Sequence, residues 1–385
     1  MNFLMTVAWL QLTHKKTRLL IALAGIAFAV ILMFMQLGFS DALYDSNVRV
    51  HTKLKGDIFL ISPKSVALNT LITFSQRRLY QAQSFDDVES VSSVYIDFGF
   101  WNNPQNHTIR QIFTMGINTD EDVLDLPDLK QNIDKIKIPD VVLFDRDSRT
   151  EFGPVATEFD QGKTITTEVN NRRITIGALF KLGTSFAANG TLITSDLNFV
   201  RIFSTKRQKG LIDIGVIRLK PGANAENLVK AMRKELPQDV RVLSKQEFIN
   251  LEKDYWKSTT AIGFIFTVGI IMGFMVGAVI VYQILYSDVS EHLSEYATLK
   301  AMGYKSSFLF NLVFQEAIIL SVLGYIPGFA LCLGLYEMTR NATLLPIFMS
   351  FSRATTVIIL TILMCAISGA IAMRKVQSAD PADIF

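Results

Sequence analysis

Residues that could carry chemistry are few in this sequence and stand far apart. The nearest approach to a nucleotide site is Gly162-Lys163-Thr164, which matches the end of a phosphate-binding P-loop. The leading glycine of that motif would fall on Thr157, so we interpret the segment as a β-turn. The four histidines lack metal-ligand spacing, and no Gly-x-Ser-x-Gly motif occurs. We therefore expect a non-catalytic chain with no metal site and no cofactor of its own.

Two cysteines and one glutamate lie inside long apolar runs. Cys332 and Cys365 are interpreted as packing residues, and the rest of the chain has no cysteine for a disulfide. Glu316 is an acidic residue about two helical turns into its run. A charge at that depth of a membrane is costly unless it pairs, protonates or reaches the interface. Either Glu316 makes a polar contact that couples its span to the cytoplasmic helix predicted in loop 287–307, or the span begins later and leaves Glu316 at the headgroups.

The apolar runs indicate a membrane protein. The chain has 385 residues, of which 50% are apolar and 19% are charged, and the apolar excess gathers in four runs. Each run approaches the roughly 20 residues that a helix needs to cross a bilayer. The predicted spans are residues 19–39, 261–286, 308–335 and 355–373. We therefore expect an α-helical membrane protein with four transmembrane helices and one large α+β domain outside the membrane.

Positive charges beside the spans set the expected orientation, because short basic flanks favour the cytoplasmic side. Such residues precede the first span and follow the last; they are Lys15, Lys16, Arg18, Arg374 and Lys375. Both termini, loop 287–307 and tail 374–385 are therefore expected in the cytoplasm, with residues 40–260 and loop 336–354 outside. Residues 1–18 suit an amphipathic helix on the cytoplasmic surface, or equally an extension of the first span.

The domain between the first two spans is predicted to have helical ends. Residues 40–55 and 244–260 read as two helical stalks. Segments 56–117 and 204–243 each show a strand–helix–strand order, and two such βαβ units commonly pair into one sheet with helices on one face. Residues 118–203 hold four strand-like stretches and are predicted as an inserted β-rich lobe.

Glycines recur at helical spacing in two of the spans. Gly269, Gly273 and Gly277 stand four apart in the second span, and Gly324 and Gly328 do so in the third. Small residues on one helix face let another helix approach closely inside lipid. These glycines therefore predict helix contacts, either with a second copy of the chain in a dimer or within one chain.

A short sided helix is predicted in loop 287–307, where a simple turn would suffice to join two spans. Tyr296, Leu299 and Met302 share one stripe, Glu295 precedes them, and Gly303 is a helix-ending residue. The chain has no ATP site of its own. We therefore interpret this helix as a docking element on which a partner acts and through which force reaches the spans.

These segments resemble the FtsX/MacB-type family of ABC transporter permeases. In that family an acidic residue leads into a Leu-Lys/Arg-Ala-x-Gly motif in the cytoplasmic loop, and a glutamate precedes a Gly-x-x-x-Gly span. The matching positions here are Glu295, Leu299, Lys300, Ala301, Gly303, Glu316, Gly324 and Gly328. The resemblance covers the whole chain, including the ending "ADPADIF". Within the family, the sequence most resembles the DevC permeases of cyanobacteria, which are associated with glycolipid export.

The resemblance implies a set of partners. Such a permease is a homodimer in the bacterial inner membrane, with two ABC ATPase subunits that hold ATP and Mg beneath it. The loop helix sits in a groove of each ATPase, and the stalks carry its movement to the outer domains by mechanotransmission. In tripartite systems the outer domain docks a periplasmic membrane-fusion (adaptor) protein and a TolC-like outer-membrane channel.

The resemblance leaves three functions open. The first is the permease of a tripartite export system that moves a lipid, a glycolipid or another amphiphile from the periplasmic side toward the outer membrane. The second is an FtsX-like signal relay that activates an envelope hydrolase. The third is a lipoprotein-releasing permease. A membrane enzyme is disfavoured because no catalytic constellation is visible.

Overall fold

The computed structural model describes residues 9–10, 12–13, 16–205, 207–295, 298, 302–304 and 306–373. Its contacts divide the chain into two compact units. The sheet unit comprises residues 42–260 and 343–346, and the bundle unit comprises the remainder of the chain. Each unit is described separately below. Tail 374–385 and most of the helix predicted at residues 1–18 lie outside the described residues.

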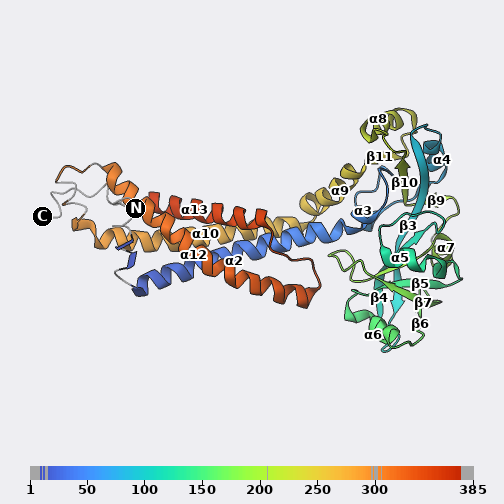
Figure 1. The fold of residues 1–385 in the computed structure, drawn as a ribbon, viewed down its shortest axis with the longest axis horizontal. Helices are drawn as coiled ribbons and strands as arrows, with labels where there is room; N and C mark the ends of the chain where they lie inside the picture. Colours follow the sequence, from blue (N-terminus) through green and yellow to red (C-terminus); the bar gives the residue numbers. More distant parts are fainter. Residues whose placement is uncertain are drawn as a thin grey trace. The chain divides into compact units, whose positions relative to one another are not determined.

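The bundle unit is built from four long helices (Figure 1). They are α2 (Lys16–Asn47), α10 (Ala261–Glu291), α12 (Ser306–Thr343) and α13 (Phe351–Ala372). All four are long and apolar enough to cross a membrane. Each contains nearly the whole of one predicted span, so the apolar runs located all four. Cys332 and Cys365 are both buried, as expected of packing residues.

The bundle helices differ in how much of their surface they bury. α2 carries a stripe of fully enclosed side chains at helical spacing, including Ile26, Val30 and Met33. In contrast, α10 exposes large apolar side chains such as Phe264, which is 69% exposed, and Val279, which is 63% exposed. Apolar side chains that face outward along a long helix are favourable in a lipid environment and unfavourable in water.

The sheet unit contains one nine-stranded sheet in the order β11-β1-β10-β3-β4-β8-β5-β7-β6. Its strands are β1 (Ile58–Ile61), β3 (Val88–Asn102), β4 (Ile109–Ile117), β5 (Val141–Asp145), β6 (Thr166–Val169), β7 (Arg172–Phe180), β8 (Thr191–Ser195), β10 (Ile214–Leu219) and β11 (Arg241–Ser244). A second small sheet pairs β2 (Phe74–Ser75) with β9 (Leu211–Ile212). The shorter helices are α3 (Arg49–Lys53), α4 (Arg77–Gln83), α5 (Pro127–Asn132), α6 (Val155–Asp160), α7 (Asp196–Ile202), α8 (Ala225–Glu235) and α9 (Lys245–Asp254), with 3-10 turns at Leu68–Thr70, Ile133–Lys137 and Thr150–Phe152.

The two βαβ units interleave in this sheet. One unit is β1–α4–β3 and the other is β10–α8–β11; β10 lies between β1 and β3, and β1 lies between β10 and β11. Alternate residues of β1 serve two cores, because side chains along a strand point to opposite faces. Ile58 and Leu60 pack with residues of α4 and α8, whereas Phe59 and Ile61 pack in a second core with Phe248 of α9. The helices of the two βαβ units, α4 and α8, therefore share one face of the sheet, as predicted, and α9 packs on the other.

The middle region extends the same sheet. β4 pairs in parallel with β8, β8 pairs antiparallel with β5, and β5 pairs in parallel with β7. β6 pairs antiparallel with β7 and also with the end of β3. The residues predicted as an inserted β-rich lobe therefore share a continuous sheet with the βαβ units. The segment expected as a β-turn follows α6 and holds Gly162 at a φ of +78°, the left-handed region that favours glycine.

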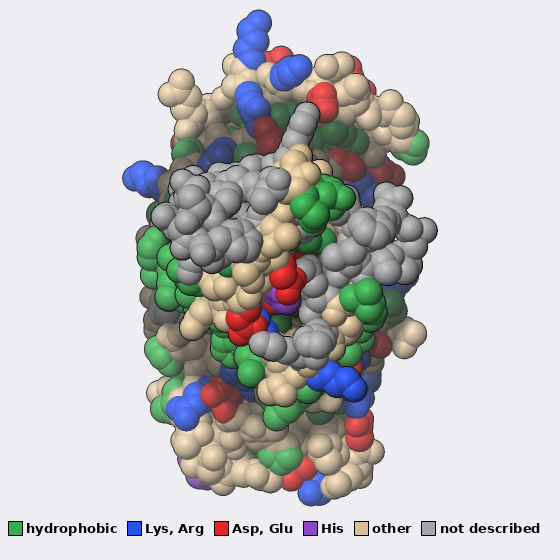
Figure 2. Space-filling model, turned by 90° about the vertical axis from the view of Figure 1, so that its left-hand side faces the viewer, with side chains coloured by type: hydrophobic (Ala, Val, Ile, Leu, Met, Phe, Trp, Pro, Cys, Tyr) green, Lys and Arg blue, Asp and Glu red, His purple; other side chains and the backbone are tan. Residues whose placement is uncertain are grey.

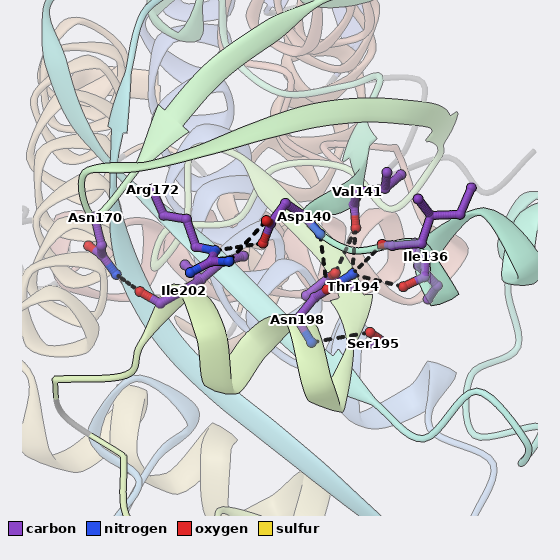
Figure 3. A network of polar contacts seen from close by, with 10 residues as sticks. Ile136, Asp140, Val141, Asn170, Arg172, Thr194, Ser195, Asn198 and Ile202 are labelled. Carbon is purple, nitrogen blue, oxygen red and sulfur yellow. Dashed lines mark hydrogen bonds and ion pairs between the residues drawn. The ribbon is translucent and has the colours of Figure 1, made fainter.

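One asparagine holds the middle strands together (Figure 3). The Asn198 side chain donates to the carbonyl oxygens of Ile136, Ile138 and Val141, and it accepts the Asp140 N–H at 3.0 Å. Arg172 of β7 binds the Asp140 carboxylate through two nitrogens, at 2.5 and 2.9 Å. Because these bonds join α7, the entry to β5 and the start of β7, they fix the middle region in one register.

The two predicted stalks are helical but differ at their ends. The first consists of the end of α2 and α3. The second consists of α9 followed by a π-helix at Tyr255–Thr259, and its path is interrupted at Thr260, which is extended. The hydroxyls of Ser258 and Thr260 donate to carbonyls four residues back, at 2.6 and 2.8 Å. Such side-chain bonds compete with the regular helix pattern, which accounts for the irregular turn.

Candidate coupling site

The loop that joins α10 to α12 is partly described. Tyr296, Leu299, Lys300 and Ala301, which were predicted to form the docking helix, lie outside the described residues. Glu295, Met302 and Gly303 are described. α10 itself continues to Glu291, past the predicted end of the span. Figure 2 looks onto this end of the chain and shows acidic side chains beside a histidine.

The described part of this loop has helical bonding and a defined end. The Nδ1 atom of His292 lies 3.1 Å from the Oε2 atom of Glu295. The Met302 N–H donates to the Thr298 carbonyl at 3.0 Å, which is the spacing of an α-helix. Gly303 follows at a φ of +93°, the left-handed conformation in which helices commonly end. Met302 and Gly303 therefore have the bonding and the backbone conformation of a helix end, whereas residues 299–301 lie outside the described residues.

Apolar side chains are exposed beside this turn. Met302 is 64% exposed and Tyr304 is 45% exposed. A Cβ on Gly303 would meet no atom within 4 Å, so the backbone conformation requires glycine here and crowding does not. The turn thus presents apolar side chains outward, as a docking surface would.

A cluster of charges links the start of α2 to the end of α10. Arg18 lies 3.2 Å from Asp288 and 3.1 Å from Glu291, and it donates to the Ile284 carbonyl at 2.7 Å. Arg18 therefore binds the last turns of α10, from which the loop begins. We call Arg18, Asp288 and Glu291 the inner ionic cluster.

Glu316 of α12 is fully buried near this cluster. Its side chain has no exposed surface, and neither carboxyl oxygen has a hydrogen-bond partner among the described residues. The charges of Asp288 and Arg18 act on it. This burial shows that protein encloses Glu316, and both interpretations of its depth in the membrane stay predictions. An enclosed carboxyl without partners is costly in its charged form, so Glu316 is a candidate for a change of partner during movement.

A second polar cluster lies at the other end of α2. Arg353 of α13 binds Asp41 of α2 at 2.6 and 3.0 Å, and its guanidinium lies 5.4 Å from the ring centre of Tyr336. The Tyr336 hydroxyl donates to the Phe34 carbonyl. Arg18 and Asp41 are 23 residues apart on one helix, or roughly 35 Å at 1.5 Å per residue. The two clusters are therefore separated by about the thickness of a bilayer core, which is ~30 Å.

The predicted glycines all face α2 of the same chain. A Cβ on Gly269 would collide with Gln36; one on Gly277 would lie 2.6 Å from Ala29 and would also collide with Met364 of α13. Gly273 faces Leu32. Close approach of α10 to α2 therefore requires small residues, and this spacing serves packing inside one chain.

The glycines of α12 also face side chains of α2. A Cβ on Gly324 would lie 2.5 Å from Ile26, and one on Gly328 would lie 2.7 Å from Val30. Both contacts are to side chains of α2. These glycines therefore pack helices together within one chain, and their predicted role in a dimer stays a prediction.

A buried glutamate and histidine join the two stalks in the sheet unit. Glu252 of α9 accepts the Leu68 N–H and the Trp256 indole N–H, both at 2.7 Å. His51 of α3 lies 3.5 Å away, and both side chains are 1% exposed. Burial raises the pKa of Glu252 to about 7 and lowers the pKa of His51 to about 3. We call Glu252 and His51 the stalk pair. The sequence analysis missed it because both residues stand among polar, helix-forming residues.

Two protein-family models match the chain. The MacB-like periplasmic core domain matches residues 19–235, and the FtsX-like permease C-terminal domain matches residues 261–381. Since the first match alone covers more than half of the chain, this protein belongs to the FtsX/MacB-type permease family. It is thus a transmembrane ABC permease component with a large extracytoplasmic domain, of a kind that works with ABC ATPase partners.

Solved structures give more distant likenesses. The periplasmic region of MacB from Actinobacillus actinomycetemcomitans is 12% identical, with a TM-score of 0.36, and the match covers 56% of this chain and 97% of that one. The extracellular domain of the noncanonic ABC-type transporter YknZ from Gram-positive bacteria is 10% identical, with a TM-score of 0.34, over 49% of this chain and 99% of that one. A domain of a permease protein from Porphyromonas gingivalis is 13% identical, with a TM-score of 0.31, over 50% and 88%. No curated protein sequence matches the chain.

Proposed function

We propose that this protein is the permease subunit of a tripartite export system of the MacB type. In this proposal a separate ATPase binds the loop between α10 and α12, and its ATP cycle moves the helices. The outer domain docks a periplasmic adaptor, which leads to a TolC-like channel. The cargo is a lipid, a glycolipid or another amphiphile taken from the periplasmic side, and the chain acts as a homodimer with both termini in the cytoplasm.

The observation that carries the proposal is the helical turn that ends at Gly303. It stands between two membrane helices, and its neighbours Met302 and Tyr304 expose apolar side chains. Exposed apolar groups beside charged ones are typical of a protein-docking surface. The inner ionic cluster ties the same end of α10 to α2, whose other end continues into the first stalk. A force applied at the turn therefore has a helical path toward the outer domain.

Amphiphile export is supported by the character of the helices. Their outward side chains are apolar along much of their length, and the cysteines and glycines between them are packed against neighbours. A hydrophilic channel would need a polar lining. Movement of cargo outside the membrane, driven by the stalks, needs no such path.

The first experiment is purification of the full chain from its native membrane in mild detergent, with partners identified by mass. We expect a P-loop ATPase and an adaptor protein to be recovered with the wild-type chain. Glu295→Lys should lose the ATPase, because it reverses a charge beside the turn. Glu337→Lys is the matched control: Glu337 also lies beside a basic side chain three residues away, Arg340, but it is at the other end of α12.

Three outcomes bear on the proposal. Loss of the ATPase from Glu295→Lys alone, with the adaptor present in wild type, supports it. An ATPase recovered with a hydrolase or a lipoprotein carrier, and without an adaptor, would replace tripartite export by signal relay or lipoprotein release. A wild-type preparation without any ATPase would overturn the proposed function.

A further inference from the structure

A loop in the sheet unit is fastened to three separate parts of the chain. It comprises residues 182–188, between β7 and β8, and we call it the junction loop. The buried carboxylate of Asp145, at the end of β5, accepts the N–H groups of Leu182 and Gly183 at 3.1 and 2.9 Å. Gly183 has a φ of +93°, a conformation that side-chain-bearing residues rarely adopt. Asp145 therefore fixes the first turn of the loop to the middle of the sheet.

The first stalk also forms hydrogen bonds with the junction loop. Arg49 of α3 donates from one nitrogen to the carbonyls of Leu182 and Thr184, at 3.1 and 3.2 Å. Asn47, the last residue of α2, accepts the Ala187 N–H at 3.1 Å. These bonds hold both ends of the loop to the residues in which the first membrane helix terminates.

The third attachment comes from the connection between α12 and α13. The hydroxyl of Thr184, which is 1% exposed, donates to the carbonyl of Leu344 at 3.2 Å. Leu344 directly follows α12, which ends at Thr343, and it belongs to the sheet unit. Its φ is +59°, which is unusual for a bulky residue and stores strain that the surroundings must hold. Leu345, the next residue, is buried.

We propose that the junction loop couples α12 to the first stalk, with Thr184 and Arg49 as its positioning residues. α2 is continuous from Lys16 to Asn47, and α12 from Ser306 to Thr343. A displacement of α2 therefore reaches the junction loop through Asn47, and a displacement of α12 reaches it through Leu344. Asp145 transmits either displacement to the sheet. The proposal rests on the proposed function and adds a route from the third span that the coupling turn and stalks do not provide.

The test uses hydrogen exchange on the complex of the full chain with its co-purified ATPase, with and without ATP plus vanadate. We expect trapping to change exchange in the peptides that cover residues 182–188 and 344–350. Thr184→Val removes the hydroxyl at nearly constant volume. The variant should still assemble with the ATPase and still show the change in hydrogen exchange at residues 344–350. The change in exchange at residues 182–188 should be about fivefold smaller, which is the factor in an equilibrium constant that one hydrogen bond contributes.

Two control variants separate coupling from general damage. Thr184→Ser keeps the hydroxyl and should behave as wild type. Thr70→Val removes an exposed hydroxyl whose bond is local, to the Ala67 carbonyl at 3.3 Å, and should also behave as wild type. A full response at 182–188 in Thr184→Val, or no response there in wild type despite ATPase binding, would overturn the coupling alone. Absence of an ATPase would overturn the proposed function and the coupling with it.

Discussion

Two buried glutamates, one in each unit, are enclosed to the same degree and bonded very differently. Glu252 and Glu316 are both almost without exposed surface. Glu252 accepts two hydrogen bonds and lies beside His51. Glu316 accepts none among the described residues. The hydrogen bonds of Glu252 therefore help to hold the two stalks, whereas no described hydrogen bond offsets the cost of burying the Glu316 carboxyl.

The difference indicates where each unit resists change. A buried group with its partners in place rigidifies its surroundings, and one without them costs free energy that another arrangement could recover. Arg18 lies close by and already binds Asp288 and Glu291, so an exchange of partners toward Glu316 would open the inner ionic cluster. The bundle thus holds a buried carboxyl without a described partner near its coupling loop, whereas both carboxyl oxygens of Glu252 are bonded.

The largest expected effect comes from the same substitution at the two glutamates. Glu252→Leu leaves the Leu68 N–H and the Trp256 indole N–H buried without a partner and should cost about 3 kcal/mol of stability. Glu316→Leu removes a buried carboxyl that has no described partner, and it should leave stability unchanged or raise it by about 1 kcal/mol. Thermal unfolding of the full chain in detergent measures both. Equal destabilisation by the two variants would show that the glutamates do not differ in this way.

A smaller effect is expected from pH on the stalk pair. The pKa of Glu252 is raised by burial from its ordinary value of 4.5 to about 7. The folded state therefore favours the protonated form, and the stability that this form contributes is full below pH 4.5 and lost as pH rises through 7. At about 1.4 kcal/mol per pKa unit, the loss is roughly 3 kcal/mol or less.

Glu252→Gln isolates this titration, because His51 titrates in both proteins. Unfolding should be followed for wild type and variant at pH 5 and pH 8. Relative to wild type, the variant should gain stability at the higher pH, by less than the difference between the two leucine variants. A gap between the two proteins that stays constant with pH would place the pKa of Glu252 near its ordinary value.

Much of this architecture could be predicted from the sequence, because its causes are local. Runs of apolar residues located the four helices, and strand–helix–strand order located the two βαβ units. β4 was missed, since Gly116 and the polar residues between its apolar ones blur the alternation. The sharing of one sheet by the middle region depends on pairing between β4 and β8, which no local pattern encodes.

The functional residues also differ in whether the local sequence could predict them. Gly303 was predictable because its conformation is a property of one residue. The glycines of α10 and α12 predicted close contact but could not name α2 as the partner. Glu252, Asp145 and Thr184 gave no signal at all, because their roles arise from burial and from backbone groups more than 35 residues away.

The central claim is that the turn before Gly303 docks an ATPase, and cross-linking tests it most directly. A photoreactive residue in place of Met302, which is 64% exposed, should yield an adduct with a P-loop ATPase in native membranes. The same residue in place of Met338, which is 71% exposed near the other end of α12, should not. An adduct at residue 302 alone is the predicted result. No ATPase adduct at 302, or the same adduct at both positions, would contradict the account.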